Sequence, residues 1–509
     1  MEILVTVQGS RGHPSNLFLH LGMLQEIQWI LILEICYTLI VIATCLRIIY
    51  DTRSTTKTLA YLMLTVFLPV VGIIIYVCVG TNYRKRKLYS KKIVRDAQMQ
   101  AHITEHIYLE SSRVWSTVPE EILKYQKLAQ LLLNDGTSYL TGNNKVEILL
   151  NGEHKFPEVI RCLKAAKHHI HIEYYIFEDD EIGNQIKDVL IEKARAGVQV
   201  RLIYDDFGSR SIRTKVIDEL KEAGVEAYPF YKVMFIALAN RLNYRNHRKI
   251  IVIDGNIGFT GGINVSDRYI NSPENTEQVF WRDTHVKITG TGMFYLQYLF
   301  IGDWNFCSDT MLKPIPAFFR EQKEPAGEAI VQIAASGPDS DNPTILFSLI
   351  QAIGMAETEI LITTPYFIPG ESLLDAMVVA ALSGVKVILL VPDKSDSHMV
   401  AAAARSYYNE LMNAGVEIYQ YEKGFIHAKT LVTDGQLSVI GTANMDNRSF
   451  ELNFEVNCVI YDNETAKEMT RIFYRDLKDA KRIDPGEWEK RPQYKQLPEK
   501  LSRLLSPLL

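Results

Sequence analysis

Residue patterns that hold metal ions are missing from this sequence of 509 residues. Its six cysteines are scattered, and no CxxC pair or Cys/His cluster of the zinc-binding kind occurs. No cluster of carboxylates is available to hold a divalent cation either. The cysteines show no close pairing, so no disulfide framework is expected and a reducing compartment is favoured. We therefore expect neither a metal nor another cofactor.

An excess of positive charge is missing as well. The 55 lysines and arginines are outnumbered by 60 aspartates and glutamates, which gives a formal net charge of -5. This balance gives no support for nucleic acid as the main partner. The first 26 residues also lack the basic region that opens a signal peptide. A nucleic-acid-binding role and a cleaved leader are therefore both disfavoured.

Long apolar runs are present near the N-terminus. Ile27–Leu46 spans twenty residues interrupted by Glu34, and Leu59–Val79 spans twenty-one residues without a charge. Each run is long enough to cross a hydrocarbon core of about 30 Å as a helix. The alternative is a buried helix pair, but Pro69 and Gly72 in the second run are better tolerated in membrane helices. We expect a transmembrane helical hairpin that makes the protein integral to the membrane.

Basic residues follow the second run. Seven lysines and arginines lie between Arg84 and Arg95, whereas the loop between the runs holds only Arg53 and Lys57. The positive-inside rule then predicts a multi-pass protein of the cell membrane, with its N-terminus and its large C-terminal part in the cytoplasm. The basic run is either a solvated helix face or a segment attracted to anionic lipid headgroups.

A five-residue motif occurs twice in the rest of the sequence. The first copy, in NHRKIIVIDGNIGFTGGIN, contains His247, Lys249, Asp254, Gly261 and Asn264. The second, in IHAKTLVTDGQLSVIGTAN, contains His427, Lys429, Asp434, Gly441 and Asn444, each 180 residues after its counterpart. Because two matches with identical internal spacing are not a chance event, the motif predicts a functional site.

The residue types of the motif indicate phosphate chemistry. The β-branched runs IIVID and TLVTD predict buried strands, and residues two apart on a strand share a face. The histidine and lysine of each copy are therefore expected in one cavity, where an imidazole beside an ammonium suits an oxyanion. Asp254 and Asp434 complete the predicted catalytic motif. Each precedes a glycine, so we expect strand-end turns and a supporting rather than a direct chemical role.

The elements around the motif repeat in the same order. The strand pattern of residues 165–177 returns at 356–368, the helix–turn–strand pattern of 190–206 returns at 380–393, and EAGVEAYPF returns as NAGVEIYQY. Alternating helices and hydrophobic strands predict an α/β fold with a mainly parallel or mixed sheet in each half. We predict three domains: residues 1–110 with the hairpin and basic segment, 111–325 as the first half and 326–509 as the second.

Each half supplies one histidine and one lysine, so neither half alone holds both a nucleophile and an acid. Facing each other across a pseudo-two-fold axis, the halves would surround a phosphodiester. One imidazole would attack phosphorus while the other protonates the leaving oxygen, and the roles would reverse in the second step. The lysines would stabilise the non-bridging oxygens.

The paired motifs resemble those of the phospholipase D superfamily, and the chain from about residue 20 onward is similar to bacterial cardiolipin synthases. Further similarity lies in EYYIFEDDEIG, DDFGSR, NRSFELNFE and the terminal RLLSPLL. The resemblance implies two phospholipase D-like halves. It also implies transfer of a phosphatidyl group from one phosphatidylglycerol to another, with release of glycerol and a covalent intermediate on the N-terminal histidine, His247. His427 is then the acid and base.

The resemblance also assigns supporting residues. Glu455 matches the acid that orients the histidine of the second half, and Asp283 is its candidate counterpart in the first. Thr442 is expected to offer a hydroxyl near the phosphate, where the first half has Gly262. Asn264 and Asn444 are expected to donate to the phosphate, with a turn role as the alternative.

Other functions remain open at this point. A hydrolytic phospholipase D or another phosphatidyltransferase would use the same residues, and phosphatidylethanolamine could serve as the second lipid. The net charge and the apolar runs disfavour a nuclease of the same superfamily. A non-catalytic membrane scaffold is disfavoured because both motif copies are intact. The sequence indicates no oligomeric state.

Overall fold

The computed structural model describes residues 14–51, 55–77, 111–116, 118–136, 138–230, 244–271, 279–320, 324–504 and 506, with side chains from residue 29 onward except at 56 and 57. The chain divides into an N-terminal unit, Met1–Arg84, and a C-terminal unit, Lys85–Leu509. The basic run Arg84–Arg95 lies outside the described residues. The membrane orientation that depends on this run stays a prediction.

The described residues of the N-terminal unit form three helices, α1 (Pro14–Asp51), α2 (Thr55–Phe67) and α3 (Pro69–Ile75). Within α1, Trp29–Asp51 is the one stretch of the described residues that is long and apolar enough to cross a membrane. Its 23 residues have a mean hydropathy of 2.3, and most of its large apolar side chains are exposed, although Ile48 is buried. The first helix of the expected hairpin is therefore supported.

The second apolar run differs from the expectation. It breaks at Leu68 (φ -134°, ψ 67°), because Pro69 disfavours a helical conformation in the preceding residue. α3 then packs closely on α2: a side-chain carbon on Gly72 would collide with the backbone of Thr65. Helices of 13 and 7 residues are each too short to span a hydrocarbon core. The structure does not support a second continuous transmembrane helix.

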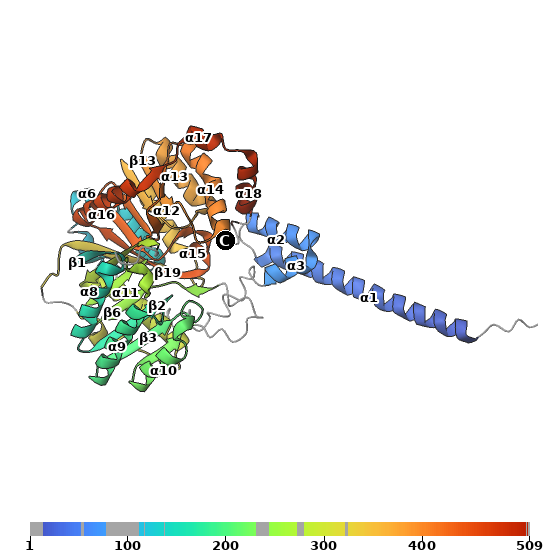
Figure 1. The fold of residues 1–509 in the computed structure, drawn as a ribbon, viewed down its shortest axis with the longest axis horizontal. Helices are drawn as coiled ribbons and strands as arrows, with labels where there is room; N and C mark the ends of the chain where they lie inside the picture. Colours follow the sequence, from blue (N-terminus) through green and yellow to red (C-terminus); the bar gives the residue numbers. More distant parts are fainter. Residues whose placement is uncertain are drawn as a thin grey trace, which may run out of the picture. The chain divides into compact units, whose positions relative to one another are not determined.

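The C-terminal unit consists of two halves with the same succession of elements (Figure 1). The first half comprises β1 (Thr141–Leu150), α8 (Asn151–Ala165), β2 (His169–Tyr174), α9 (Glu181–Arg195), β3 (Gln199–Tyr204), α10 (Lys215–Glu222), β4 (Glu226–Pro229), β5 (Arg245–Asn246), β6 (Ile250–Ile253), β7 (Ile257–Gly261), β8 (Phe280–Arg282), β9 (Thr284–Thr289) and α11 (Phe294–Cys307).

The second half repeats this order and adds several short strands and helices. It comprises β10 (Ala329–Ser336), α12 (Thr344–Gly354), β11 (Glu359–Thr363), β12 (Phe367–Ile368), α13 (Gly370–Leu382), β13 (Lys386–Pro392), α14 (His398–Asn413), β14 (Glu417–Tyr421), β15 (Gly424–Ile426), β16 (Thr430–Thr433), β17 (Leu437–Gly441), β18 (Met445–Asp446), α15 (Asn447–Glu451), β19 (Asn453–Tyr461), α16 (Asn463–Asp476), β20 (Ala480–Arg482), α17 (Pro485–Glu489) and α18 (Gln493–Leu504).

One continuous mixed sheet joins the halves. Its order is β20-β14-β13-β11-β16-β17-β19-β10-β1-β9-β7-β6-β2-β3-β4, so the strands on either side of the β10–β1 junction mirror one another. β2, β3 and β4 pair in parallel, as do β11, β13 and β14, while the strands nearer the junction pair antiparallel. The predicted mixed sheet and the duplicated α/β fold are confirmed.

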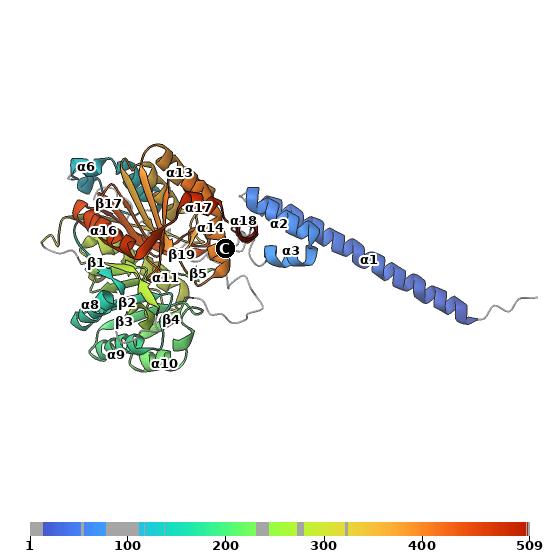
Figure 2. The same ribbon diagram turned by 45° about the horizontal axis from the view of Figure 1, so that its top comes forward.

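Helices cover both faces of the sheet. One face packs against α8, α9 and α10 in the first half and against α12, α13 and α14 in the second, with a separate hydrophobic core in each. A third core lies on the opposite face, where α11 and α16 cover strands of both halves. Figures 1 and 2 show the first half in teal to green and the second in orange to red. Because this core is shared, the halves are one folded body.

The short helices α6 (Glu120–Leu123) and α7 (Gln126–Gly136) precede the first half in sequence but pack in the core of the second. Lys124 beside them forms an ion pair with Asp434 at 2.7 Å. Buried leucines of α7, such as Leu128 and Leu132, complete this core. The segment therefore fastens the start of the first half to the second.

Candidate active site

The two histidines of the motif lie just before strands rather than on them. His247 and Lys249 occupy the extended link between β5 and β6, and His427 and Lys429 the link between β15 and β16. Each lysine Nζ donates to the carbonyl of its own histidine, at 2.8 Å in the first half and 2.5 Å in the second. The sequence predicted the histidines and lysines within the strand region, but they lie in the links just before β6 and β16. Each histidine still lies beside its lysine.

Short strands from opposite halves position these links. β5, just before His247, pairs in parallel with the start of β19, and His247 N donates to Phe454 O at 3.0 Å. β15, just before His427, pairs with β8, and His427 N donates to Arg282 O at 2.7 Å. Each histidine is therefore docked beside a strand of the other half.

The orienting carboxylates consequently cross between halves. His247 Nδ1 lies 2.9 Å from Glu455 Oε2, and His427 Nδ1 lies 2.7 Å from Asp283 Oδ2. Glu455 and Asp283 are the predicted residues, but each was expected to serve the histidine of its own half. With Nδ1 held by a carboxylate, Nε2 of each ring is the nitrogen left for substrate chemistry.

The electrostatics of the site fit an anion. Burial lowers the pKa of Lys249 to about 7 and that of Lys429 to about 8, because a buried ammonium loses its hydration. Burial also lowers the pKa of His247 and brings that of His427 to about 3, and both lysines depress both imidazoles. The two lysines and the two imidazoles are thus electrostatically coupled, and a bound phosphate would offset the positive charge of the lysines.

The aspartates of the motif do not join this group. Asp254 and Asp434 have positive φ values of 52° and 54° in the turns after β6 and β16. The Asp254 carboxylate accepts from the backbone N–H groups of residues 167 to 169, and Asp434 accepts from those of residues 357 to 359. Each one ties the start of a neighbouring strand, as a supporting role requires.

The Thr442 hydroxyl bonds to a carboxylate, and its expected contact with the phosphate stays a prediction. The hydroxyl lies 2.5 Å from Glu455 Oε2, and the amide of Asn453 donates to Oε1 at 3.1 Å. The counterpart of Thr442 is Gly262, where any side chain would collide with the Asp283 carboxylate. Asp283 instead accepts from Thr284 N at 2.7 Å. The carboxylates are therefore supported differently in the two halves.

The two predicted asparagines also have local partners. Asn264 donates to the Tyr269 hydroxyl at 2.7 Å and accepts from Ile176 N at 3.2 Å, so its side chain is used within the first half. Asn444 accepts no hydrogen bond at its buried Oδ1, and its side chain interacts with Asp446. Phosphate contact by these two residues stays a prediction.

Aromatic rings that the motif did not reveal surround the histidines. Tyr175 meets His247 edge-on at 4.9 Å between centroids, and Trp281 lies 5.4 Å from His427. Tyr269 and Phe425 lie 5.9 Å from His427. Tyr175 belongs to the stretch EYYIF, and Trp281 lies two residues before Asp283 in FWRD. Their nearness in sequence to residues already assigned to the site could have indicated them.

A buried charge network behind His247 was also missed. Arg248 pairs with Asp303 at 2.5 Å, and Asn246 donates to the nearby Glu173. Burial and the neighbouring Asp303 raise the pKa of Glu173 well above its usual value. The second half has Ala428 at the position of Arg248. The network is thus a property of the first half alone.

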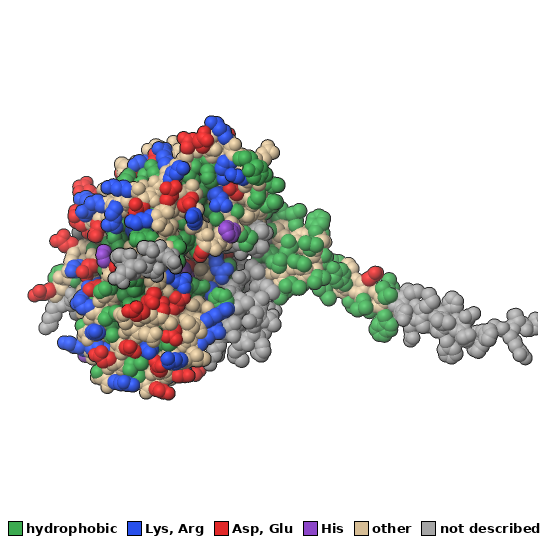
Figure 3. Space-filling view, viewed as in Figure 1, with side chains coloured by type: hydrophobic (Ala, Val, Ile, Leu, Met, Phe, Trp, Pro, Cys, Tyr) green, Lys and Arg blue, Asp and Glu red, His purple; other side chains and the backbone are tan. Residues whose placement is uncertain are grey.

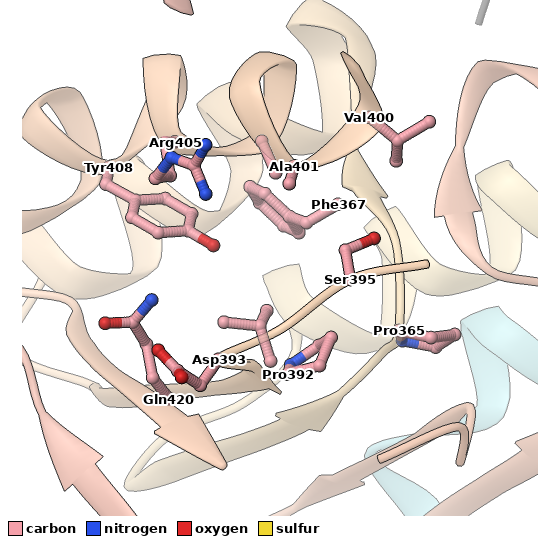
Figure 4. A pocket seen from close by; sticks show the side chains of 12 residues that line it. Pro365, Phe367, Pro392, Asp393, Ser395, Val400, Ala401, Arg405, Tyr408 and Gln420 are labelled. Atoms are coloured by element: carbon pink, nitrogen blue, oxygen red, sulfur yellow. The ribbon is translucent and has the colours of Figure 1, made fainter. Parts of the chain in front are cut away.

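A pocket with about 340 Å³ of empty space lies elsewhere in the second half (Figure 4). Its walls come from α14, with Arg405 and Tyr408, and from the segment after β13, with Asp393. It contains neither histidine of the motif. Within the described residues, no group of three or more His, Cys, Asp or Glu side chains could hold a metal ion.

Comparison with known proteins identifies the family. A model described as "Cardiolipin synthase, PLD-like domain" matches twice, at residues 159–289 and 349–477. A cardiolipin synthase 2 of Bacillus cereus is 41% identical over 469 residues, covering 91% of this chain and 88% of that one. The chain belongs to the cardiolipin synthase family. It is therefore an enzyme of the phosphatidyltransferase class.

Other relatives agree with this family assignment. The major cardiolipin synthase ClsA of Bacillus subtilis is 38% identical and covers 94% of this chain and 99% of that one. A model described as "Phospholipase D-nuclease N-terminal" matches residues 38–80, across the helices of the N-terminal unit. Among solved structures, a phosphatidylserine synthase of Haemophilus influenzae matches with a TM-score of 0.57 at 16% identity, over 75% of this chain and 100% of that one. This match shows a shared fold.

Proposed function

We propose that this cardiolipin synthase family member transfers a phosphatidyl group from one phosphatidylglycerol to the hydroxyl of another at the cytoplasmic face of a membrane. The observation that carries the proposal is the pair of histidines, each oriented by a carboxylate from the opposite half. Two equivalent acid–base groups in one site suit a reaction that breaks one P–O bond and forms another of the same kind.

In the first step, Nε2 of His247 attacks phosphorus and the bond from phosphorus to the glycerol headgroup breaks. His427 gives its proton to the departing oxygen, so glycerol leaves as a neutral alcohol. In the second step, His427 takes the proton of a hydroxyl on the incoming lipid, whose oxygen attacks phosphorus. The P–N bond breaks, and cardiolipin and free His247 are formed.

The support given to Glu455 favours His247 as the covalent carrier. A phosphorylated imidazole held at Nδ1 by a carboxylate gains positive charge, so an ionised partner stabilises it. Burial alone would raise the pKa of Glu455, but His247, Lys249 and Thr442 lower it overall. The Thr442 hydroxyl therefore helps to keep this carboxylate charged.

Proton uptake is expected to accompany substrate binding. With a pKa of about 3, His427 is neutral in the free enzyme, whereas an acid must carry a proton. Burial is the largest cause of this low pKa, and the charges of Lys429 and Lys249 lower it further. A bound phosphodiester offsets the charges of the two lysines. The pKa of His427 therefore rises when substrate binds.

Product analysis tests the proposal directly. Purified full-length protein with headgroup- and acyl-labelled phosphatidylglycerol should give cardiolipin and free glycerol in equal amounts, separated by thin-layer chromatography. The His247→Ala variant is the matched control and should give neither. Phosphatidic acid as the main lipid product would identify a hydrolase instead. Addition of phosphatidylethanolamine would show whether a second lipid is accepted.

A further inference from the structure

The C-terminal helix α18 presents an apolar stripe to solvent. Its sequence, QYKQLPEKLSRL, places large apolar side chains at helical spacing along one face. Four of them are more than half exposed: Tyr494, Leu497, Leu501 and Leu504. Figure 3 shows hydrophobic atoms at this edge of the C-terminal unit, where Figure 1 places α18. Exposing an apolar stripe to water is unfavourable in free energy, and contact with an apolar phase removes this penalty.

The opposite face fastens the helix firmly to the second half. Glu499 is buried and pairs with Arg405 at 3.0 Å and with both terminal nitrogens of Arg491 at 2.9 Å. Beyond the helix, Ser506 interacts with the Tyr407 hydroxyl at 3.0 Å and accepts from Asn447 at 3.2 Å. α18 is therefore a docked element, and the direction in which its stripe points is set by the fold.

The charges of α18 are complementary to an anionic surface. Lys500 is exposed beside the stripe, and Lys495 is exposed nearer to the face of Glu499. Glu499, the helix's one acid, is buried against Arg405 and Arg491. Basic residues bordering an apolar stripe are typical of helices that lie in the interface of anionic lipids. The stripe, from Tyr494 to Leu504, is about 15 Å long at 1.5 Å per residue. It can lie in an interface but is too short to cross a bilayer.

We propose that α18 docks in the surface of an anionic phospholipid membrane and thereby holds the catalytic site at the lipid interface. The link to the site is short: Asn447, which bonds to Ser506, opens α15 directly after β18 and the Asn444 stretch. This contact is additional to membrane attachment through α1. It does not depend on which lipid is transferred.

Photo-crosslinking in the full-length protein tests the docking. Leu501→p-benzoylphenylalanine in proteoliposomes of phosphatidylglycerol and phosphatidylethanolamine should give a lipid adduct on irradiation. Lys467→p-benzoylphenylalanine, on the exposed face of α16, is the matched control and should give little. Uncharged lipid in place of phosphatidylglycerol should weaken the adduct at residue 501. A protein–protein adduct, which would assign the stripe to a second copy, overturns the proposal, and so does equal lipid labelling at both positions.

Activity on two substrate forms gives a second readout. Leu497→Glu combined with Leu501→Glu should lower transfer on vesicles by about tenfold while sparing transfer in detergent micelles. The control combines Val379→Glu with Leu382→Glu on α13, where both side chains are also exposed, and should affect neither form. An equal loss in vesicles and micelles overturns the docking role. The lipid adduct needs no turnover, so it separates a failure of this proposal from a failure of the proposed transfer reaction.

Discussion

His247 and His427 make equivalent backbone hydrogen bonds, but the carboxylates that orient them have different partners. Both rings hold a carboxylate of the opposite half at Nδ1, and both backbone N–H groups bond to that half. Glu455, however, also receives the hydroxyl of Thr442, whereas Asp283 lies against Gly262. The duplicated fold thus supplies two similarly oriented histidines, and non-duplicated residues give their carboxylates different support.

Removal of each histidine should show the proposed division of roles most strongly. His247→Ala should form no phosphoenzyme with any substrate. His427→Ala should lose turnover of the natural lipid by about 10²–10⁴-fold, because the leaving oxygen no longer receives a proton. With an activated lipid whose leaving group needs no proton, His427→Ala should still become labelled and then stall. Acid quenching with radiolabelled lipid measures both outcomes, and label in His247→Ala would reverse the roles.

The charge network behind His247 should matter for stability in the first half. Arg248→Met leaves Glu173 and Asp303 buried without the arginine, so the free energy of unfolding should fall by about 3–5 kcal/mol. Arg471→Met on the exposed face of α16 is the control and should change it by less than about 0.5 kcal/mol. Thermal or denaturant unfolding of the detergent-solubilised protein measures the difference. Equal stability of the two variants would show that the network is not structural.

Loss of the Thr442 hydroxyl should have a smaller effect, limited to the reaction at His247. Thr442→Val keeps the side-chain shape but removes the hydrogen bond to Glu455, so the rate of phosphoenzyme formation should fall by about tenfold. Thr442→Ser keeps the hydroxyl and should restore most of the rate. Single-turnover labelling with activated lipid measures it. A rise in KM without a change in that rate would instead support the direct phosphate contact expected from the sequence.

The pH dependence should reflect the two lysines. Their pKa values of about 7 and about 8 lie below the usual value for lysine, so in the free enzyme they lose charge as the pH rises from 7 to 9. Only the protonated form attracts a phosphodiester, so kcat/KM should fall over this range. Bound anion keeps the lysines charged, so kcat should fall less. A flat kcat/KM up to pH 9 would show that these lysines stay protonated.

The chemistry-bearing residues could be found from the sequence because the motif is repeated with identical spacing. The crossing of Glu455 and Asp283 could not, because it depends on pairing between β5 and β19 and between β8 and β15. Strands of two or three residues leave no periodic pattern in the sequence.

The membrane segment shows the same limit. Its apolar composition could be identified from the sequence. The break in the helix at Leu68, however, is a local effect of Pro69 that segment length and hydropathy do not predict.

The measurement closest to the central claim compares Asp283→Asn with Glu455→Gln in single-turnover labelling by activated lipid, with peptide mapping of the labelled histidine. Crossed pairing predicts that label on His247 forms slowly in Glu455→Gln and at near the wild-type rate in Asp283→Asn, which then stalls before the second transfer. Whichever histidine carries the label, the substitution that slows labelling should be the one in the opposite half. If labelling of His247 is slowed by Asp283→Asn and not by Glu455→Gln, the composite site described for this enzyme is contradicted.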